Sequence, residues 1–151
     1  MSTTSMTLAE REAFLALPLI AVISIPEPRR GPLTVPVWYR YEPGGDVCVW
    51  TGSKTRKAQL LKGTQRISIC IMDPNPPYKY VTIEGPFSIE SVQFERDVRQ
   101  MALHYFGPKG GEDYLKAIGG PAGVTEDILV RLHPERWLTV DYSKLGPLPQ
   151  S

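Results

Sequence analysis

The chain has 151 residues, 42% hydrophobic and 22% charged, which is the length and composition of one globular domain. Its formal net charge of +1 creates no overall field that would attract nucleic acid or an anionic membrane, so we expect neither partner. The N-terminus has no apolar core of the signal-peptide kind, and the longest apolar run, residues 15–25, is too short to span a bilayer. These features predict a cytoplasmic protein.

We expect a single domain over residues 1–151, with residues 1–6 and 144–151 as flexible tails. Cys48 and Cys70 each lie in an apolar, strand-like run and show no metal-ligand spacing, so the sequence predicts no metal site. Such cysteines suit buried thiols in a reducing compartment better than they suit a disulfide.

The predicted elements begin with a short helix. Thr7 followed by Glu10 has the form of a capping box, and Pro18 should end this helix. Segments rich in β-branched and aromatic residues then recur between turn-forming stretches, which predicts antiparallel strands. The predicted strands are 19–25, 33–41, 46–51, 66–72, 79–90, 128–132 and 137–142. The fold class is therefore mainly β, a closed or nearly closed barrel of about six to seven antiparallel strands with peripheral helices.

Three further helices interrupt or follow these strands. Residues 55–62 form a brief helical stretch that Gly63 should stop. Residues 93–105 carry apolar side chains at helical spacing, which predicts an amphipathic helix packed on the barrel. The glycines and proline of residues 107–111 should end it, before a short helix at 113–118.

The segment 50–57, Trp-Thr-Gly-Ser-Lys-Thr-Arg-Lys, leaves a strand and enters a helix. The cations Lys54, Arg56 and Lys57 and the hydroxyls of Ser53 and Thr55 gather where a helix N-terminus already favours an anion. A guanidinium can hold phosphate oxygens bidentately, whereas ammonium groups act as point charges. The alternative is a solvated connecting loop in which Thr55 is only a helix N-cap, and residue types alone leave both interpretations open.

The segment 31–39 places Pro36 inside a predicted strand. Because proline has no N–H, this position suits an edge strand, a bulge or a strand that faces a ligand. A planar heterocycle could bond to the exposed backbone groups while Trp38 or Trp50 forms an apolar wall. Alternatively, both tryptophans are ordinary core residues.

Neither histidine has the sequence context of a catalytic group. His104 lies beside the apolar face of a predicted helix and His133 precedes Pro134 at a strand end, without a carboxylate or cysteine in ligand spacing. The sequence also contains no nucleophile elbow, Walker loop or dinucleotide-binding glycine motif. Hydrolysis and nucleoside-triphosphate chemistry therefore lack support, and no catalytic residue is assigned.

Taken together, residues 16–142 resemble the pyridoxamine 5′-phosphate oxidase-like superfamily, whose fold is a split, FMN-binding-like β-barrel. The most specific likeness is Trp50-Thr51 followed after three residues by Thr55-Arg56-Lys57, similar to the family's phosphate-binding pattern. The segments 31–39, 79–85 and 130–137 are also similar to the family's strands.

The resemblance implies a homodimer with the cofactor at the subunit interface. In that arrangement Arg56, Lys57 and Thr55 would hold the phosphate, and Tyr80 would contact the ring. The cofactor-binding residues predicted from the motifs and the resemblance are Pro36, Val37, Trp38, Trp50, Thr51, Ser53, Lys54, Thr55, Arg56, Lys57 and Tyr80. Tyr80 stands where the vitamin-processing oxidases usually carry glutamine, and their C-terminal Trp-plus-Arg clamp is incomplete here, so pyridoxamine phosphate oxidation itself is not expected.

The short chain, the Pro-Val-Trp-Tyr strand and the additional Lys54 are more similar to the subgroup that uses the deazaflavin coenzyme F-420. The polyglutamate-bearing tail of that coenzyme suits additional cations. The resemblance thus implies an oxidoreductase that transfers hydride between the deazaflavin and a small electrophilic molecule. FMN as the cofactor of an oxidase or reductase, and a non-catalytic deazaflavin carrier, are the alternatives.

Overall fold

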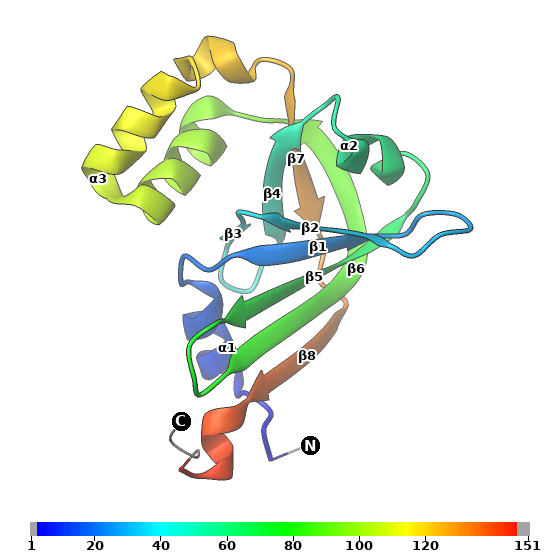
Figure 1. Cartoon of the computed structure of the whole chain (residues 1–151), viewed down its shortest axis with the longest axis vertical. Helices are drawn as coiled ribbons and strands as arrows, with labels where there is room; N and C mark the ends of the chain where they lie inside the picture. Colours follow the sequence, from blue (N-terminus) through cyan, green and yellow to red (C-terminus); the bar gives the residue numbers. More distant parts are fainter. Residues whose placement is uncertain (1–2, 148–151) are drawn as a thin grey trace.

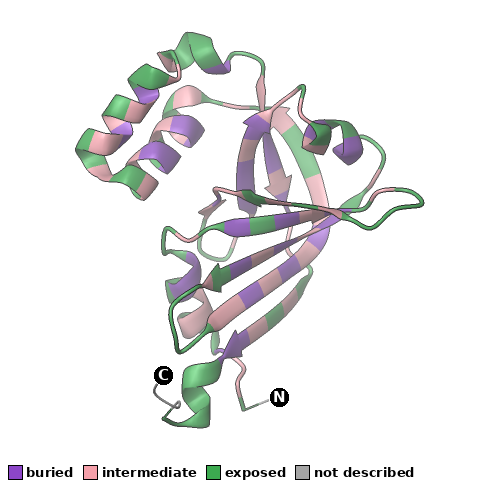
Figure 2. Cartoon of the chain, viewed as in Figure 1, coloured by how far each residue is buried: buried purple, intermediate pink, exposed green. Residues whose placement is uncertain are grey.

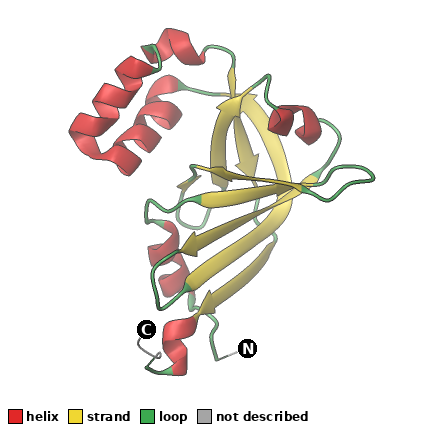
Figure 3. Cartoon of the chain, viewed as in Figure 1, coloured by secondary structure: helices red, strands yellow, loops and turns green. Residues whose placement is uncertain are grey.

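The computed structural model describes residues 3–147 as a curled sheet with helices at its ends (Figure 1). Helices and strands are coloured separately in Figure 3. None of the helices among the described residues has the length and apolar character needed to cross a membrane. The helices are α1 (Leu8–Leu15), α2 (Arg56–Leu61) and α3 (Gln100–Ala117). The strands are β1 (Ala21–Ile25), β2 (Leu33–Val37), β3 (Arg40–Tyr41), β4 (Val47–Gly52), β5 (Arg66–Asp73), β6 (Lys79–Ser91), β7 (Asp127–Leu132) and β8 (Arg136–Asp141).

The strands form one antiparallel sheet in the order β2-β1-β5-β6-β7-β4-β3, with β8 also paired to β6. The expected mainly β, barrel-like fold is confirmed. Its eight strands exceed the predicted number because the segment 33–41 is divided into β2 and β3. β2 pairs only with β1 among the described strands, so the strand that contains Pro36 is an edge strand, as the missing N–H predicts.

A tyrosine from a distant helix explains the division of the predicted strand 33–41. The backbone N–H of Tyr39 donates to the Tyr105 hydroxyl at 3.1 Å instead of to a neighbouring strand, and that hydroxyl donates to the Leu19 carbonyl at 2.7 Å. Tyr39 is itself buried, and its hydroxyl lies within hydrogen-bonding distance of carbonyl oxygens at the end of α1. The chain therefore leaves the sheet at Trp38 and Tyr39.

Side chains alternate between a buried inner face and an outer face, as the colours of Figure 2 show along β1 and β5. Ile23, Ile69 and Ile83 are fully buried in the main core, and α1 covers one end of it. On the outer face, cross-strand partners form one row from β2 to β8 that consists of Pro36, Val22, Cys70, Thr82 and Leu138.

The two cysteines are both free thiols but differ in burial. Cys48 is buried as expected, and its burial raises the pKa of the thiol. Cys70 is only half-buried, because its position in β5 places it on the outer face of the sheet. The expectation of a buried thiol was therefore wrong for Cys70.

The helical segment between β6 and β7 differs from the prediction at its centre. A π-helical stretch, Phe94–Arg99, continues into α3, and the only break lies at Gly107, where φ is 77°. Pro108 then opens the second half of α3, a position that proline favours. The predicted helix end within residues 107–111 is met at Gly107, but the second half begins at Pro108 rather than at residue 113 and continues through Gly111. A Cβ atom at Gly111 would lie 2.9 Å from the Ala102 carbonyl oxygen, so glycine here allows the two halves to pack closely.

Asp97 connects this helical segment to the strands. Its carboxylate is fully buried and accepts hydrogen bonds from Arg40 at 2.9 Å, from Arg96 at 2.8 Å and from the Gln93 backbone N–H at 2.8 Å. Burial alone would raise the pKa of Asp97, but these hydrogen bonds and the two guanidinium charges hold it below its usual value. A paired, hydrogen-bonded carboxylate therefore fixes the π-helical stretch that leads into α3 against β3.

Residues of both expected tails contact the rest of the domain where the structure describes them. Met6 is only 9% exposed and belongs to the main core, and the Asp141 backbone N–H donates to the Thr4 carbonyl at 2.7 Å. The Lys144 ammonium donates to the Ser5 carbonyl at 2.8 Å, so the first and last described segments lie together (Figure 1). The expectation of flexible tails stays a prediction, and residues 1–2 and 148–151 lie outside the described residues.

β6 is the strand on which the two halves of the sheet meet. Its first part, from Lys79 to Glu84, lies between β5 and β8, and its last part pairs with β7. At the transition the His133 backbone N–H donates to the Pro86 carbonyl at 2.8 Å, and a Cβ atom at Gly85 would collide with the His133 carbonyl oxygen. Glycine is required there because the backbone of the β7–β8 turn crosses directly over it.

We predict that Gly85→Ala lowers the free energy of unfolding by about 2–4 kcal/mol, since a methyl group forces apart two hydrogen-bonded backbones. Urea unfolding measures the change. Gly31→Ala is the matched control, because no atom lies within 4 Å of a Cβ atom placed there and the loss should stay within about 0.5 kcal/mol. Equal stability of the two variants would show that the crossing tolerates a side chain.

Candidate functional site

An open groove of about 310 Å³ lies where the end of β2, the end of β4, α2 and α3 approach one another. From the predicted cofactor-binding residues it brings together Pro36, Val37, Trp38, Trp50, Thr51 and Lys57. Gly52, which belongs to the segment 50–57 but not to the predicted binding residues, completes the lining together with Tyr114 and Asp127, which the sequence did not indicate. Ser53, Lys54, Thr55, Arg56 and Tyr80 are outside this lining.

Trp38 forms one wall of the groove from the segment that leaves β2. Its indole stacks on the Tyr105 ring with centroids 4.7 Å apart and 7° between the planes, and Tyr114 lies 5.3 Å away. Phe106 packs edge-on at 5.2 Å. Aromatic neighbours on α3 therefore fix the Trp38 ring while leaving it half-buried, so it is both a packed residue and a wall of the groove.

Trp50 forms a second wall, and Asp127 sets its orientation. Trp50 lies in β4, and its indole N–H donates to the Asp127 carboxylate at 2.8 Å. Asp127 opens β7 and pairs in register with Gly52, which places it beside the groove. Its only sequence signal was a position immediately before a predicted strand, and its partner is 77 residues away.

The three predicted phosphate-binding cations have different surroundings. Lys54 pairs with Glu126 at 3.5 Å in an almost fully exposed ion pair, and Arg56 pairs with Glu27. Lys57 lines the groove and has no ion-pair partner among residues 3–147. Of these three cations, Lys57 is therefore the one that lines the groove and forms no ion pair with a described carboxylate.

Thr55 acts as the N-cap of α2. Its hydroxyl donates to the Gly52 carbonyl at 3.0 Å and accepts from the Ala58 backbone N–H at 3.2 Å. These bonds shape the turn that carries Ser53, which is half-buried, and they place Lys57 in the first turn of the helix. The capping role that the sequence left open is thus observed for this hydroxyl.

Tyr80 lies on the outer face of β6, away from this groove. In register it stands between Met72 of β5 and Val140 of β8. Burial and its hydrogen bond with Tyr142 raise the pKa of Tyr80, so the hydroxyl is protonated at neutral pH. Pro36 shares the outer face but lies three strands away, roughly 14 Å at the usual strand spacing.

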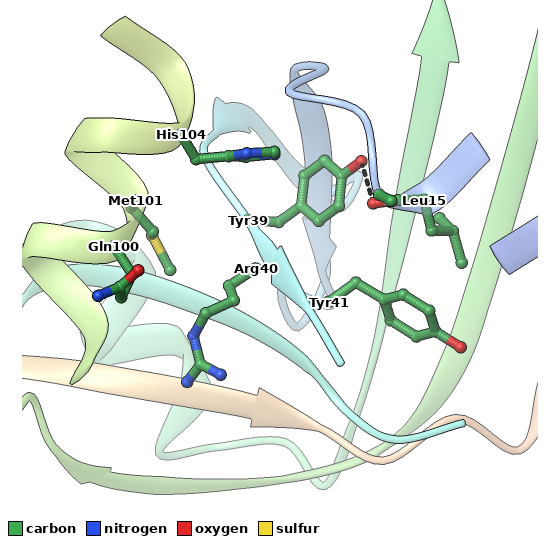
Figure 4. Close-up of a pocket in the computed structure, with 8 residues that line it drawn as sticks. Leu15, Tyr39, Arg40, Tyr41, Gln100, Met101 and His104 are labelled. Atoms are coloured by element: carbon green, nitrogen blue, oxygen red, sulfur yellow. Dashed lines mark hydrogen bonds between the residues drawn. The ribbon is translucent and has the colours of Figure 1, made fainter. Parts of the chain in front are cut away.

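A separate cleft of about 240 Å³ lies between α1, β3 and α3 (Figure 4). Figure 4 shows Gln100, Met101 and His104 of α3 on one side, Leu15 on the other, and Tyr39 and Arg40 between them. The Arg40 guanidinium is already engaged by two carboxylates, those of Glu42 and Asp97. This cleft therefore presents mainly apolar surface and no uncompensated charge from Arg40. Among the described residues, no cluster of three His, Cys, Asp or Glu side chains is placed to hold a metal ion.

Comparisons with known proteins identify the fold. A scan against models of protein families found no match, and a search of curated proteins found none. Among solved structures, a conserved hypothetical protein from Mycobacterium tuberculosis matches with a TM-score of 0.82 and 22% identity, over 100% of this chain and 94% of its own. A protein named F-420 reductase matches with a TM-score of 0.69 and 19% identity, over 84% of this chain and 94% of its own.

A third solved structure, a putative pyridoxamine 5′-phosphate oxidase from Listeria innocua, matches with a TM-score of 0.65 and 12% identity, over 87% of this chain and 96% of its own. Likeness at these identities shows the fold. The chain has the split β-barrel architecture of the pyridoxamine 5′-phosphate oxidase-like proteins, as its motifs implied.

We predict that Asp127→Ala moves the Trp50 indole N–H resonance upfield and lowers the free energy of unfolding by about 1–2 kcal/mol, because a half-buried donor loses its acceptor. Two-dimensional NMR and urea unfolding measure the two effects. Asp127→Asn keeps an acceptor oxygen and should retain most of the stability. An unshifted Trp50 resonance in the alanine variant would show that Asp127 does not orient the indole.

Proposed function

We propose that this protein is a deazaflavin-dependent oxidoreductase that binds coenzyme F-420 in the groove between Trp38 and Trp50. The observation that carries the proposal is the position of Lys57, which lines the same groove as two indoles and the end of an edge strand and has no ion-pair partner among the described residues. A phosphate-bearing planar cofactor needs a cation for its phosphate beside flat apolar surfaces for its ring. The proposed reaction is hydride transfer between the deazaflavin and a small electrophilic molecule.

The residues present fit such a cofactor. Trp38 and Trp50 offer flat apolar surfaces, and the free edge of β2 offers backbone groups for hydrogen bonds to a heterocycle. Lys57 would bind the phosphate. Lys54 and Arg56 lie on the same turn, and exposed ion pairs such as Lys54–Glu126 contribute only about 0–1 kcal/mol, so an anionic ligand can replace the carboxylate.

The position of Lys54 supports F-420 over FMN. Its side chain is 88% exposed and lies outside the groove lining, where it suits the polyglutamate tail of F-420 rather than a single phosphate.

FMN binding by an oxidase or reductase is the alternative function. A non-catalytic carrier is a further alternative, since no acid–base side chain is assigned in the groove. A cytosolic location is part of the proposed function.

Bound F-420 supplies a two-electron hydride donor or acceptor, so the protein contributes orientation and a dry surface. In this proposal the Trp38 wall is held by its stack on Tyr105, and the Trp50 wall is held by Asp127. Tyr114 lines the groove, and its burial raises the pKa of the phenol. Its protonated hydroxyl would donate a hydrogen bond to the substrate or the ring.

A homodimer is part of the proposal because one chain offers only a shallow groove. Its volume of about 310 Å³ is at the lower limit for sites that enclose a drug-sized ligand, which is smaller than F-420. The outer face of the sheet carries exposed apolar side chains, with Val22 39%, Met72 50% and Leu138 55% exposed. Burial of this face against a second copy would remove them from water and bring the partner subunit's surface to the site.

We predict that Lys57→Ala weakens F-420 binding about tenfold to a hundredfold, because a charge-assisted contact to phosphate contributes about 1.5–3 kcal/mol. Fluorescence titration of the deazaflavin measures the affinity. Lys62→Ala is the matched control: Lys62 is an exposed cation at the other end of α2 and should leave the affinity unchanged. Equal affinities of the wild type and Lys57→Ala would reject the phosphate assignment.

The same titration with FMN tests the choice of cofactor, and turnover tests catalysis. We expect F-420 to bind more tightly than FMN, and the reduced deazaflavin to be oxidised when a panel of enones is supplied. Tighter binding of FMN would favour the flavin alternative. Tight F-420 binding with no turnover across the panel would favour the carrier.

We predict that Leu138→Arg converts the dimer to a monomer, since a guanidinium on the apolar outer row opposes its burial in an interface. Light scattering coupled to size-exclusion chromatography measures the mass. Lys116→Glu, an exposed change on α3, should leave the dimer intact. A wild-type protein that is monomeric at micromolar concentration would contradict the proposed interface.

A further inference from the structure

Tyr41, which also borders the cleft of Figure 4, lines another pocket of about 260 Å³. This pocket lies between α1, the turn that precedes β4 and the turn that joins β7 to β8. Its flat surfaces come from Tyr41, Pro134 and Trp137, and its ionisable side chains are Arg11, Asp46 and His133. None of these residues belongs to the groove of the proposed cofactor.

Arg11 lies against Trp137 in this pocket. Its guanidinium carbon lies 3.7 Å from the centroid of the Trp137 ring, which is a cation–π contact. Among residues 3–147 it has no carboxylate within ion-pairing distance, and its buried Nε has no hydrogen-bond acceptor. A buried donor of this kind is normally satisfied by a further group.

The other two ionisable side chains of the pocket, Asp46 and His133, have partners within the described chain. Asp46 lies 3.0 Å from Nδ1 of His133 and 3.6 Å from the Arg131 guanidinium. Nε2 of His133 lies 3.2 Å from the Ser88 hydroxyl, so both ring nitrogens have partners. The sequence placed no carboxylate beside His133, because Asp46 is 87 residues away in the chain. Arg11 is thus the charged group of the pocket that lacks a counter-charge within the described residues.

We propose that this pocket binds a small planar carboxylate, with its carboxylate on the N–H edge of Arg11 and its ring against Trp137, Tyr41 and Pro134. The guanidinium fork matches a carboxylate bidentately. A single unpaired cation beside the Asp46 carboxylate favours a monoanion over a phosphate dianion, since the second charge would be repelled. The volume suits a molecule of fragment size rather than a cofactor. The site is independent of the proposed redox function.

Titration of the ¹⁵N-labelled full-length chain with sodium benzoate at fixed ionic strength tests this site. We expect saturable shifts of the Trp137 indole N–H and of the Gly44 and Gly45 amides. Benzamide has the same ring without the charge and should bind at least about tenfold more weakly. Arg11→Gln should weaken benzoate binding about tenfold, whereas Arg136→Gln, an exposed neighbour of Trp137, should not change it.

Three results would overturn the proposal: no saturable shift with benzoate, equal affinity for benzamide, or unchanged affinity in Arg11→Gln. If Arg11→Gln does not fold, the contrast between benzoate and benzamide on the wild type decides the question alone. Shifts of the Trp50 indole instead of Trp137 would place the anion in the cofactor groove and would also overturn it. None of these results affects the F-420 titration, so the two proposals fail separately.

Discussion

The crossing of the β7–β8 turn over Gly85 is the constraint on which the architecture depends. β6 belongs to both halves of the sheet. Its first part pairs with β5 and β8, its last part pairs with β7, and the sheet changes direction between them. The backbone bonds from His133 to Pro86 and from Glu135 to Glu84 close this transition with no room for a side chain. The groove depends on it, since β7 positions β4, and β4 carries Trp50.

A small number of specific contacts hold the groove together, and they join elements that are distant in sequence. Tyr105 on α3 terminates β2 by accepting the Tyr39 N–H, and this turns Trp38 towards the helices. Asp127 at the start of β7 holds Trp50. The cationic turn then enters α2 under a threonine cap, which places Lys57 in the lining of the groove together with the indoles. The two firmly packed indoles therefore lie next to the exposed, weakly paired cations of this turn. Recognition of a planar anionic ligand requires both.

Local signals were sufficient to predict much of this arrangement. The capping box at Thr7 and Glu10 forms with both of its hydrogen bonds, and Pro36 lies on an edge strand because its missing N–H allows little else. Asp97 and Asp127 could not be recognised, since each acts through partners that the fold brings from elsewhere. The continuity of α3 through Gly111 was likewise missed, because a glycine that permits close packing has the same local signal as one that ends a helix.

A crystal structure of the protein with coenzyme F-420 tests directly whether the groove binds this cofactor. We expect the phosphate within hydrogen-bonding distance of the Lys57 ammonium and the ring beside Trp38, Trp50 and the edge of β2. A structure in which Lys57 extends into bulk water while the coenzyme occupies another surface would contradict this expectation.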